Sequence, residues 1–287
     1  MPHERLGKSR VVRSALTGTT EVRVLITGAS GDVGSEVRRA IRERYEFVRC
    51  LDIRQMDAAG PNEEVMIADL NDPGAAARAV EGIDVVFHAA GYRMEGSWEQ
   101  ILPANIEAVV ALFEAARAAA VKRIVYASSH HAVGYYPMSR ALGTEEPTRP
   151  DSRYAVSKVF GEALCRLFSD KYGISTISLR IGAFRPEPQT PRHLAVWISP
   201  GDMGRLAIAS IEASDVHCAI VYGVSANTRR VWTDDAAAEI GYVPQDDADA
   251  LADMAEISKV VEPSLSVPYH GGLSVADEFC GDEAKLN

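Results

Sequence analysis

The sequence predicts an α/β protein built on a doubly wound parallel sheet, with a small C-terminal lobe beside it. Short β-branched runs alternate with stretches of helical periodicity along most of the 287 residues, at spacings typical of βαβ units. A glycine-rich turn separates the first run from the first helical stretch. A hydrophobic fraction of 47% suits a sizeable core and excludes a wholly disordered chain.

The expected strands are short apolar or β-branched runs. The first, at 21–26, breaks off in Thr27-Gly28, which indicates a strand followed by a tight turn. The second, at 47–52, ends at Asp52. The later runs lie at 65–67, 84–88, 124–127, 177–181 and 220–222.

The expected helices place apolar residues three or four positions apart. Val33, Val37 and Ile41 share one face of residues 32–44. A longer helix is expected over 104–119, directly after Pro103. Further helices are expected at 73–80, 154–172, 202–213 and 246–258.

The charge balance and the cysteines narrow the class of protein. The net charge of −10 argues against non-specific nucleic-acid binding and against an anionic-membrane anchor. No apolar run is long enough to span a membrane, and the basic N-terminus lacks the apolar region of a secretory signal. The four cysteines lie far apart without a C-x-x-C pair, so we expect reduced thiols in a cytoplasmic protein and no metal site.

The turn after the first strand has the spacing of a phosphate-binding loop. Gly28, Gly31 and Gly34 fall at the first, fourth and seventh positions of G-x-x-G-x-x-G, and Asp32 and Val33 lie between the last two. The glycines permit a tight turn, a close approach of backbone to a pyrophosphate, and packing of helix on sheet. The N-terminus of the following helix adds free N–H groups and partial positive charge. Glycines alone also suit a turn without a ligand, but the flanking strand and helix favour a dinucleotide cofactor.

Asp52, at the end of the second strand, bears on which dinucleotide binds. It lies 24 residues after Gly28, where a carboxylate accepts hydrogen bonds from the adenosine ribose and repels a 2′-phosphate. NAD is therefore favoured over NADP. Arg54 leaves NADP open, because a guanidinium two residues on can hold a 2′-phosphate.

Two more segments are expected along the cofactor. Asp69 and Leu70 follow the third strand and are expected to border the adenine, with a helix cap as the alternative for Asp69. Ala89, Ala90 and Gly91 end the fourth strand with small residues, which lets a cofactor pass close to backbone.

A tyrosine and a lysine one helical turn apart indicate proton chemistry. Tyr154 and Lys158 stand at i and i+4, so their side chains share one face of the expected helix. A nearby ammonium lowers the pKa of a phenol, which makes the phenolate a usable general base toward an alcohol. Ser128 and Ser129 end the fifth strand, where a hydroxyl can hold the reacting oxygen. Without that serine, Y-x-x-x-K is equally typical of an exposed helix pair.

These features together resemble the extended short-chain dehydrogenase/reductase superfamily, the NAD-dependent epimerases and dehydratases. The resemblance covers roughly residues 22–225 and rests on the glycine turn, Asp52, Ala89–Gly91, Ser129, Tyr154 and Lys158. It implies a Rossmann core in which Ser129, Tyr154 and Lys158 are catalytic. Lys158 would also bind the nicotinamide ribose, and Ile53 and Ile181 would contact the cofactor.

Several segments are more closely similar to bacterial uronate dehydrogenases and to the related haloarchaeal NAD-dependent glucose-6-phosphate dehydrogenases. The similar segments are 59–64, 127–137, 180–182, 186–188, 197–199, 220–227 and 241–242. These enzymes oxidise the C1 hydroxyl of a cyclic sugar to a lactone. The resemblance therefore implies C1 oxidation of an anionic sugar with NAD, and Arg192 matches the arginine that holds the uronate carboxylate.

Three positions depart from the uronate dehydrogenase pattern. His130 stands where the family has asparagine, Ala183 replaces a serine, and Arg93 falls near a substrate-contact serine. The expected substrate residues are Arg93, Ser129, His130, His131 and Arg192. Arg93, His130 and Arg192 predict a more cationic pocket, and so a sugar acid or sugar phosphate other than galacturonate or glucuronate. The plainer alternatives are histidines that only support a polar loop and arginines that are solvated surface cations.

The chain divides into three predicted parts. Residues 1–20 are a basic extension without periodicity, expected to be loose and partly disordered. Residues 21–182 form the dinucleotide-binding core with the tyrosine helix. Residues 183–287 form a smaller substrate-side lobe integrated with that core. Four prolines between 186 and 200 mark the change, because no single regular element accommodates them.

Two other functions fit the same core. A nucleotide-sugar epimerase or dehydratase uses the same cofactor, but only 129 of the 287 residues follow Lys158, which is little for a bulky nucleotide-sugar site. A dinucleotide-sensing protein is the second alternative, and the complete serine, tyrosine and lysine set argues against it because a sensor needs no base. A homo-oligomer is also expected, since a helix face of this fold suits a second copy.

Overall fold

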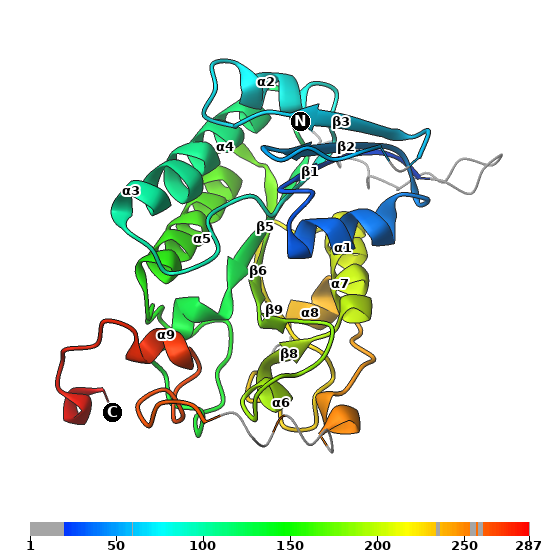
Figure 1. Ribbon diagram of the computed structural model, residues 1–287. Helices are drawn as coiled ribbons and strands as arrows, with labels where there is room; N and C mark the ends of the chain where they lie inside the picture. Colours follow the sequence, from blue (N-terminus) through cyan, green and yellow to red (C-terminus); the bar gives the residue numbers. More distant parts are fainter. Residues whose placement is uncertain (1–19, 59, 234–235, 253–256, 258–260, 287) are drawn as a thin grey trace, which may run out of the picture.

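The computed structural model describes residues 20–58, 60–233, 236–252, 257 and 261–286 (Figure 1). The expected N-terminal extension, residues 1–20, lies outside the described residues except for Thr20. No helix in the described ranges is long and apolar enough to cross a membrane.

Seven parallel strands form one central sheet in the order β3-β2-β1-β4-β5-β6-β9. The order reverses between β1 and β4, which confirms the predicted doubly wound sheet. Because every pair is parallel, the carboxyl ends of all seven strands meet at one edge. The strands are β1 Thr20–Thr27, β2 Tyr45–Asp52, β3 Glu63–Ile67, β4 Val85–His88, β5 Arg123–Ser129, β6 Ser175–Ile181 and β9 Cys218–Gly223.

Helices cover both faces of the sheet (Figure 1). On one face α1 and α7 pack together, and Val37 and Met203 share a buried cluster with the strands. On the other face α2, α4 and α5 enclose a second cluster around Leu112 and Phe168. The helices are α1 Asp32–Ile41, α2 Ala75–Val80, α3 Trp98–Ile101, α4 Ala108–Ala118, α5 Arg153–Tyr172, α6 His193–Val196, α7 Pro200–Glu212, α8 Ala236–Glu239 and α9 Leu273–Ala276.

The helix expected after Pro103 begins earlier than predicted. Helix α3 starts at Trp98. Ser97 caps its N-terminus, and Ser97 N donates a hydrogen bond to Gln100 Oε1 at 3.1 Å. The chain then widens into a π-helical turn, η1 (Leu102–Glu107), before α4. Proline lacks a backbone donor, so the turn that contains Pro103 departs from α-helical geometry without ending the helical path.

The segment after residue 182 is shared between the sheet and a smaller lobe. Strand β9 pairs with β6, and α7 packs on α1, so both belong to the central layers. The rest forms a two-stranded sheet of β7 (Ala183–Phe184) and β8 (Trp197–Ile198) with short helices around it. Of the helix expected at 246–258, the structure has a 3₁₀ turn, η3 (Ala248–Leu251), and most of the remainder lies outside the described residues.

The C-terminal segment returns to the loop between β5 and α5. Met138 N donates to Pro268 O at 2.7 Å, His270 N donates to Tyr136 O, and Gly271 N donates to Gly134 O at 2.9 Å. These contacts hold the end of the chain against the residues that follow Ser129.

A buried ion pair joins α5 to β6, the strand next to the edge strand β9. Glu162 accepts two hydrogen bonds of 2.9 Å from the Arg180 guanidinium, whose side chain is 1% exposed. Ser128 Oγ donates to the same carboxylate at 2.7 Å. Removing one partner would leave a buried charge without compensation.

We expect Glu162→Ala to lower the free energy of unfolding by about 3–5 kcal/mol, because the Arg180 charge would stay buried alone. Chemical denaturation measures the loss. Glu114→Ala is the matched control, since the Glu114–Arg117 pair is exposed and should contribute about 0–1 kcal/mol. Equal losses in the two variants would contradict the role of burial.

Candidate active site

The glycine turn between β1 and α1 is built for close backbone approach. Gly28 has φ +69°, and a Cβ there would lie 2.6 Å from Ala90 N. A Cβ on Gly34 would overlap the Gly28 carbonyl. Gly31 is the N-cap of α1 and its N–H bonds to Gly28 O at 3.0 Å, while Val33 packs against the core beneath. Side chains at the two outer glycines would collide with backbone atoms of this turn. Because both positions are glycine, the turn forms and the N-terminus of α1 stays open to a phosphate.

Asp52 is buried at the end of β2 and faces the same turn. Its carboxylate accepts hydrogen bonds from Ser30 N and from Arg54 N, both at 3.0 Å. Burial raises the pKa of this carboxyl, but the hydrogen bonds outweigh it and hold the pKa below its usual value. The Arg54 side chain is 62% exposed and 3.5 Å from Asp52. Ile53 is also exposed, as suits a residue on the path of an adenine.

The next strand ends carry the other expected cofactor residues. Leu70 is buried, whereas Asp69 Oδ1 accepts from Asn71 N within a local turn. The helix-cap alternative for Asp69 is wrong, because Gly74 is the N-cap of α2. Beyond β4, Ala89 N donates to Thr27 O at 3.0 Å, which keeps Ala89–Gly91 beside the glycine turn.

Asn105 is a buried residue that the sequence analysis did not identify. It lies in the π-helical turn η1 and accepts from Tyr92 N at 2.6 Å through Oδ1. Its Nδ2 donates to Tyr92 O and to Ser157 Oγ, both at 2.9 Å. Asn105 thus ties the loop after Gly91 to α5 next to Lys158. A polar residue within an apolar helical pattern was the only signal for it.

Three expected catalytic residues come together at the end of β5 and the start of α5. The Ser129 hydroxyl lies close enough to the Tyr154 phenol to favour the phenolate. Lys158 Nζ lies 5.5 Å from the Tyr154 ring centroid and donates to Ala127 O at 2.8 Å. Ser152 is the N-cap of helix α5, and its Oγ accepts from Ala155 N at 3.1 Å and so fixes the first turn that carries Tyr154.

Burial governs the protonation of this group. It raises the pKa of Tyr154 to about 12, although the Ser129 hydroxyl, which favours the phenolate, opposes the shift. It also lowers the pKa of Lys158 to about 8. The pKa of Tyr154 thus lies above its usual value, whereas the sequence predicted a lowered one, because desolvation of the phenolate dominates.

The two histidines after Ser129 have different partners. His130 Nδ1 lies 3.0 Å from Ile181 O, so this nitrogen carries the proton and Nε2 is an acceptor. Burial lowers the pKa of His130 well below its usual value, with further lowering from His131 and Arg192. His131 Nδ1 lies 2.7 Å from Asp151 Oδ2, and its ring meets the edge of Tyr154 with centroids 6.1 Å apart.

Arg192 is buried beside His130 at the far side of this group. Its Nη1 donates to His270 O at 3.1 Å and lies 3.5 Å from His130 Nε2. Its Nε is buried without a hydrogen-bond partner, and the nearest carboxylate oxygen, on Glu262, is 4.0 Å away. A buried donor without an acceptor is a group that an anionic ligand could satisfy. The surface-cation alternative for Arg192 is wrong, since its side chain is 12% exposed.

The expected cationic pocket is not what the structure shows. Arg93 is 68% exposed and pairs with Asp32 at the start of α1, across the glycine turn. His130 is held neutral by burial. Arg192 is thus the one of the three that presents a buried positive charge beside the catalytic group.

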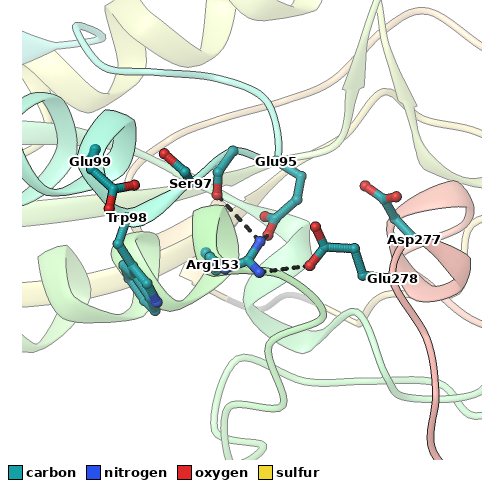
Figure 2. Close-up of a pocket in the computed structure, with 8 residues that line it drawn as sticks. Glu95, Ser97, Trp98, Glu99, Arg153, Asp277 and Glu278 are labelled. Carbon is teal, nitrogen blue, oxygen red and sulfur yellow. Dashed lines mark hydrogen bonds and ion pairs between the residues drawn. The ribbon is translucent and has the colours of Figure 1, made fainter.

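A cavity of about 320 Å³ lies next to the start of α5, but none of the expected site residues lines it (Figure 2). Arg153 stands between Glu95 at 2.7 Å and Glu278 at 2.6 Å. Glu95 also accepts from Tyr154 N at 3.2 Å. This cluster links the loop after β4, the first turn of α5 and the C-terminal segment, so it holds the backbone that carries Tyr154.

Comparison with known proteins finds one matching family and several similar relatives. A family model described as "NAD dependent epimerase/dehydratase family" matches residues 24–200. A uronate dehydrogenase of Pseudomonas syringae pv. tomato is 38% identical over 93% of this chain and 98% of the relative. An NAD-dependent glucose-6-phosphate dehydrogenase of Haloferax volcanii is 38% identical over 78% of this chain and 94% of the relative. A solved uronate dehydrogenase variant of Agrobacterium tumefaciens, complexed with NAD, is 39% identical, with a TM-score of 0.85 over 89% of this chain and 97% of that one.

The position of Asp52 yields a test of cofactor choice. In Asp52→Asn the negative charge that would repel a 2′-phosphate is gone while Arg54 remains. We expect the preference in kcat/KM for NAD⁺ over NADP⁺ to fall about 10-fold or more. The control Asp57→Asn carries the same change a few residues beyond Arg54 and should keep the original ratio. If Asp52→Asn leaves the NAD⁺ to NADP⁺ preference unchanged, the placement of Asp52 in the cofactor site is contradicted.

Proposed function

The chain belongs to the NAD dependent epimerase/dehydratase family, and we propose that it is an NAD-dependent sugar dehydrogenase. It oxidises the C1 hydroxyl of a cyclic sugar acid, or of another anionic aldose, to the lactone. Relatives called uronate dehydrogenase match 88–93% of the chain at 38–42% identity. Galacturonate and glucuronate are accordingly the first substrates to test, and glucose 6-phosphate the next.

One observation carries the proposal. A serine hydroxyl that favours the phenolate of a neighbouring tyrosine, with a buried lysine beside the tyrosine ring, lies near a buried arginine that has a free donor. The first group suits an alcohol that is to lose a proton, and the second suits an anion. A cyclic sugar acid carries both, separated by its ring.

The proposed steps use this chain's own residues. Ser129 and Tyr154 bind the C1 hydroxyl, and Tyr154 as phenolate takes its proton. Lys158, held at Ala127 O, keeps a positive charge near the phenolate. Arg192 binds the remote carboxylate and so orients C1 toward Tyr154. NAD⁺, when bound, accepts the hydride from C1.

The resident cofactor fits the residues present. The glycine turn leaves no room for side chains, and Asp52 is held ionised where a ribose would lie. Gly28, Gly31, Gly34, Asp52 and Ala89–Gly91 are the residues we propose to hold NAD. The additional contacts at Ile53, Asp69, Leu70 and Ile181 stay predictions.

The cellular compartment, the oligomeric state and the exact sugar are also proposals. The four cysteines are unpaired, which suits a cytoplasmic protein. A homo-oligomer, expected from the helical faces of the fold, stays a prediction. The reason to expect a sugar other than a uronate is weaker than the sequence implied, since Arg93 and His130 do not add charge beside Arg192.

We expect NADH to accumulate when the purified protein receives NAD⁺ with galacturonate or glucuronate. Tyr154→Phe should lower kcat by about 10²–10⁴-fold because the general base is lost. Tyr172→Phe, at the far end of the same helix, should leave the rate unchanged. No NADH from uronates, glucose 6-phosphate or glucose, with NAD⁺ still bound by calorimetry, would instead favour an epimerase or a dinucleotide sensor.

The reaction should depend on pH through Tyr154 and Lys158 together. The active form carries one proton on the pair, because a phenolate must stand beside an ammonium. With pKa values of about 12 for Tyr154 and about 8 for Lys158, the pair holds two protons below pH 8 and one above it. We therefore expect log kcat/KM to rise with unit slope to about pH 8 and then level off.

Lys158→Ala provides the comparison. Without the lysine, only the tyrosine titrates, so the rise should continue past about pH 10. Lys122→Ala, which removes an exposed lysine, should keep the original profile. A profile that levels off at the same pH with and without Lys158 would contradict this assignment.

A further inference from the structure

A buried carboxylate, Asp151, stands directly before α5 and three residues before Tyr154. Its side chain is fully buried. Oδ2 lies 2.7 Å from His131 Nδ1, and Oδ1 accepts from Ser152 Oγ at 2.8 Å. Neither the sequence analysis nor the proposed reaction assigns this residue a role.

Two glycines make room for this carboxylate. A Cβ on Gly134 or on Gly271 would overlap Asp151 Oδ2. Neither glycine has a positive φ, so backbone conformation does not require glycine at either position. The two come from separate segments, one after η2 (His130–Val133) and one near the C-terminus, and Gly271 N donates to Gly134 O at 2.9 Å. The fold therefore encloses Asp151 from two sides.

The contact fixes which nitrogen of His131 is protonated. A carboxylate only accepts hydrogen bonds, so Nδ1 carries the proton and Nε2 of the neutral ring carries a lone pair. No described residue bonds Nε2, and the His131 side chain is 18% exposed. His131 N also donates to Ser129 Oγ at 3.3 Å, which places the ring beside the catalytic serine.

We infer that Asp151 is a positioning residue that holds His131 with Nε2 as a hydrogen-bond acceptor for a hydroxyl of the sugar. Asp151 does not touch the substrate and acts through the ring of His131. This inference rests on the proposed function for the identity of the ligand, but the protonation of His131 is independent of it. Ser152 joins the arrangement to the catalytic helix, because its Oγ both donates to Asp151 and accepts from Ala155 N.

The first test reads the histidine itself in the full-length protein. We expect ¹⁵N NMR of the ring, under mildly alkaline conditions, to show His131 with the proton on Nδ1. In Asp151→Asn, whose amide can donate as well as accept, the Nε2-protonated form should appear. His131 protonated mainly on Nε2 in the unaltered protein would overturn the inference, whatever the substrate.

The second test uses substrates that lack one hydroxyl. The unaltered enzyme should prefer the parent uronate over one particular deoxy analogue, and Asp151→Asn should lose that preference about 10- to 100-fold in kcat/KM. Preferences for the other hydroxyls should persist. The double variant Asp151→Asn with His131→Ala should be no worse than His131→Ala alone.

The controls separate the possible failures. Asp170→Asn is matched, because Asp170 lies 2.8 Å from His217 Nε2 in an exposed pair, and it should change neither readout. Additive losses in the double variant, with equal loss for every analogue, would show a purely structural role and overturn the inference. If the unaltered protein forms NADH and Asp151→Asn has normal kinetics, the inference is overturned while the proposed function stands. If the unaltered protein forms no NADH, the proposed function alone is refuted.

Discussion

The parallel register of β1, β4 and β5 is the constraint on which the site depends. Thr27 pairs with His88, and His88 pairs with Tyr126, so β1 and β4 end at the same level and β5 runs beyond them to Ser129. The glycine turn follows β1, the small residues follow β4, and the two serines end β5 at this edge of the sheet. A shift of one strand by a single residue would reverse its side chains between the two faces and separate these groups. Glu162 joins α5 to the sheet, because it pairs with Arg180 of β6 and accepts a hydrogen bond from Ser128 of β5.

Burial is the second physical factor, and it divides the polar groups of the site into two kinds. Glu162 and Asn105 are buried and partnered, so they maintain the structure, and Asp151 is buried with partners that include the ring it positions, His131. Arg192 retains an unpartnered donor and His131 an unbonded nitrogen. Desolvation makes an unpaired polar group costly, so such groups are more informative about a ligand than those already paired. The same desolvation sets the opposite pKa shifts of Tyr154 and Lys158.

The sequence was sufficient where the signal was local. The strand ends, the glycine turn and the spacing of Tyr154 and Lys158 depend on neighbouring residues, and each was predicted from them. The partners of charged side chains were not accessible in this way. Arg93 pairs with Asp32, 61 positions away, and His130 is neutral because the core buries it and His131 and Arg192 disfavour its charged form. Asp151 gave no pattern at all, since its role depends on glycines brought together by the fold.

The charge of Arg192 and the polar groups beside it indicate which kind of sugar the site would accept. Arg192 is the buried cation near the catalytic group, and the Glu262 carboxylate is too far, at 4.0 Å from Nε, to take its free hydrogen bond. His130 and His131 lie between Arg192 and Tyr154. His130 Nε2 faces Arg192 Nη1 at 3.5 Å, whereas His131 Nε2 has no bond to a described residue and can accept one from a ligand. A ligand that matches this order has an anion at one end, a hydroxyl donor in its middle and an oxidisable hydroxyl at the other end. A cyclic uronate has these groups in that sequence, whereas a neutral aldose would leave the Arg192 donor buried and unpaired, which costs binding free energy.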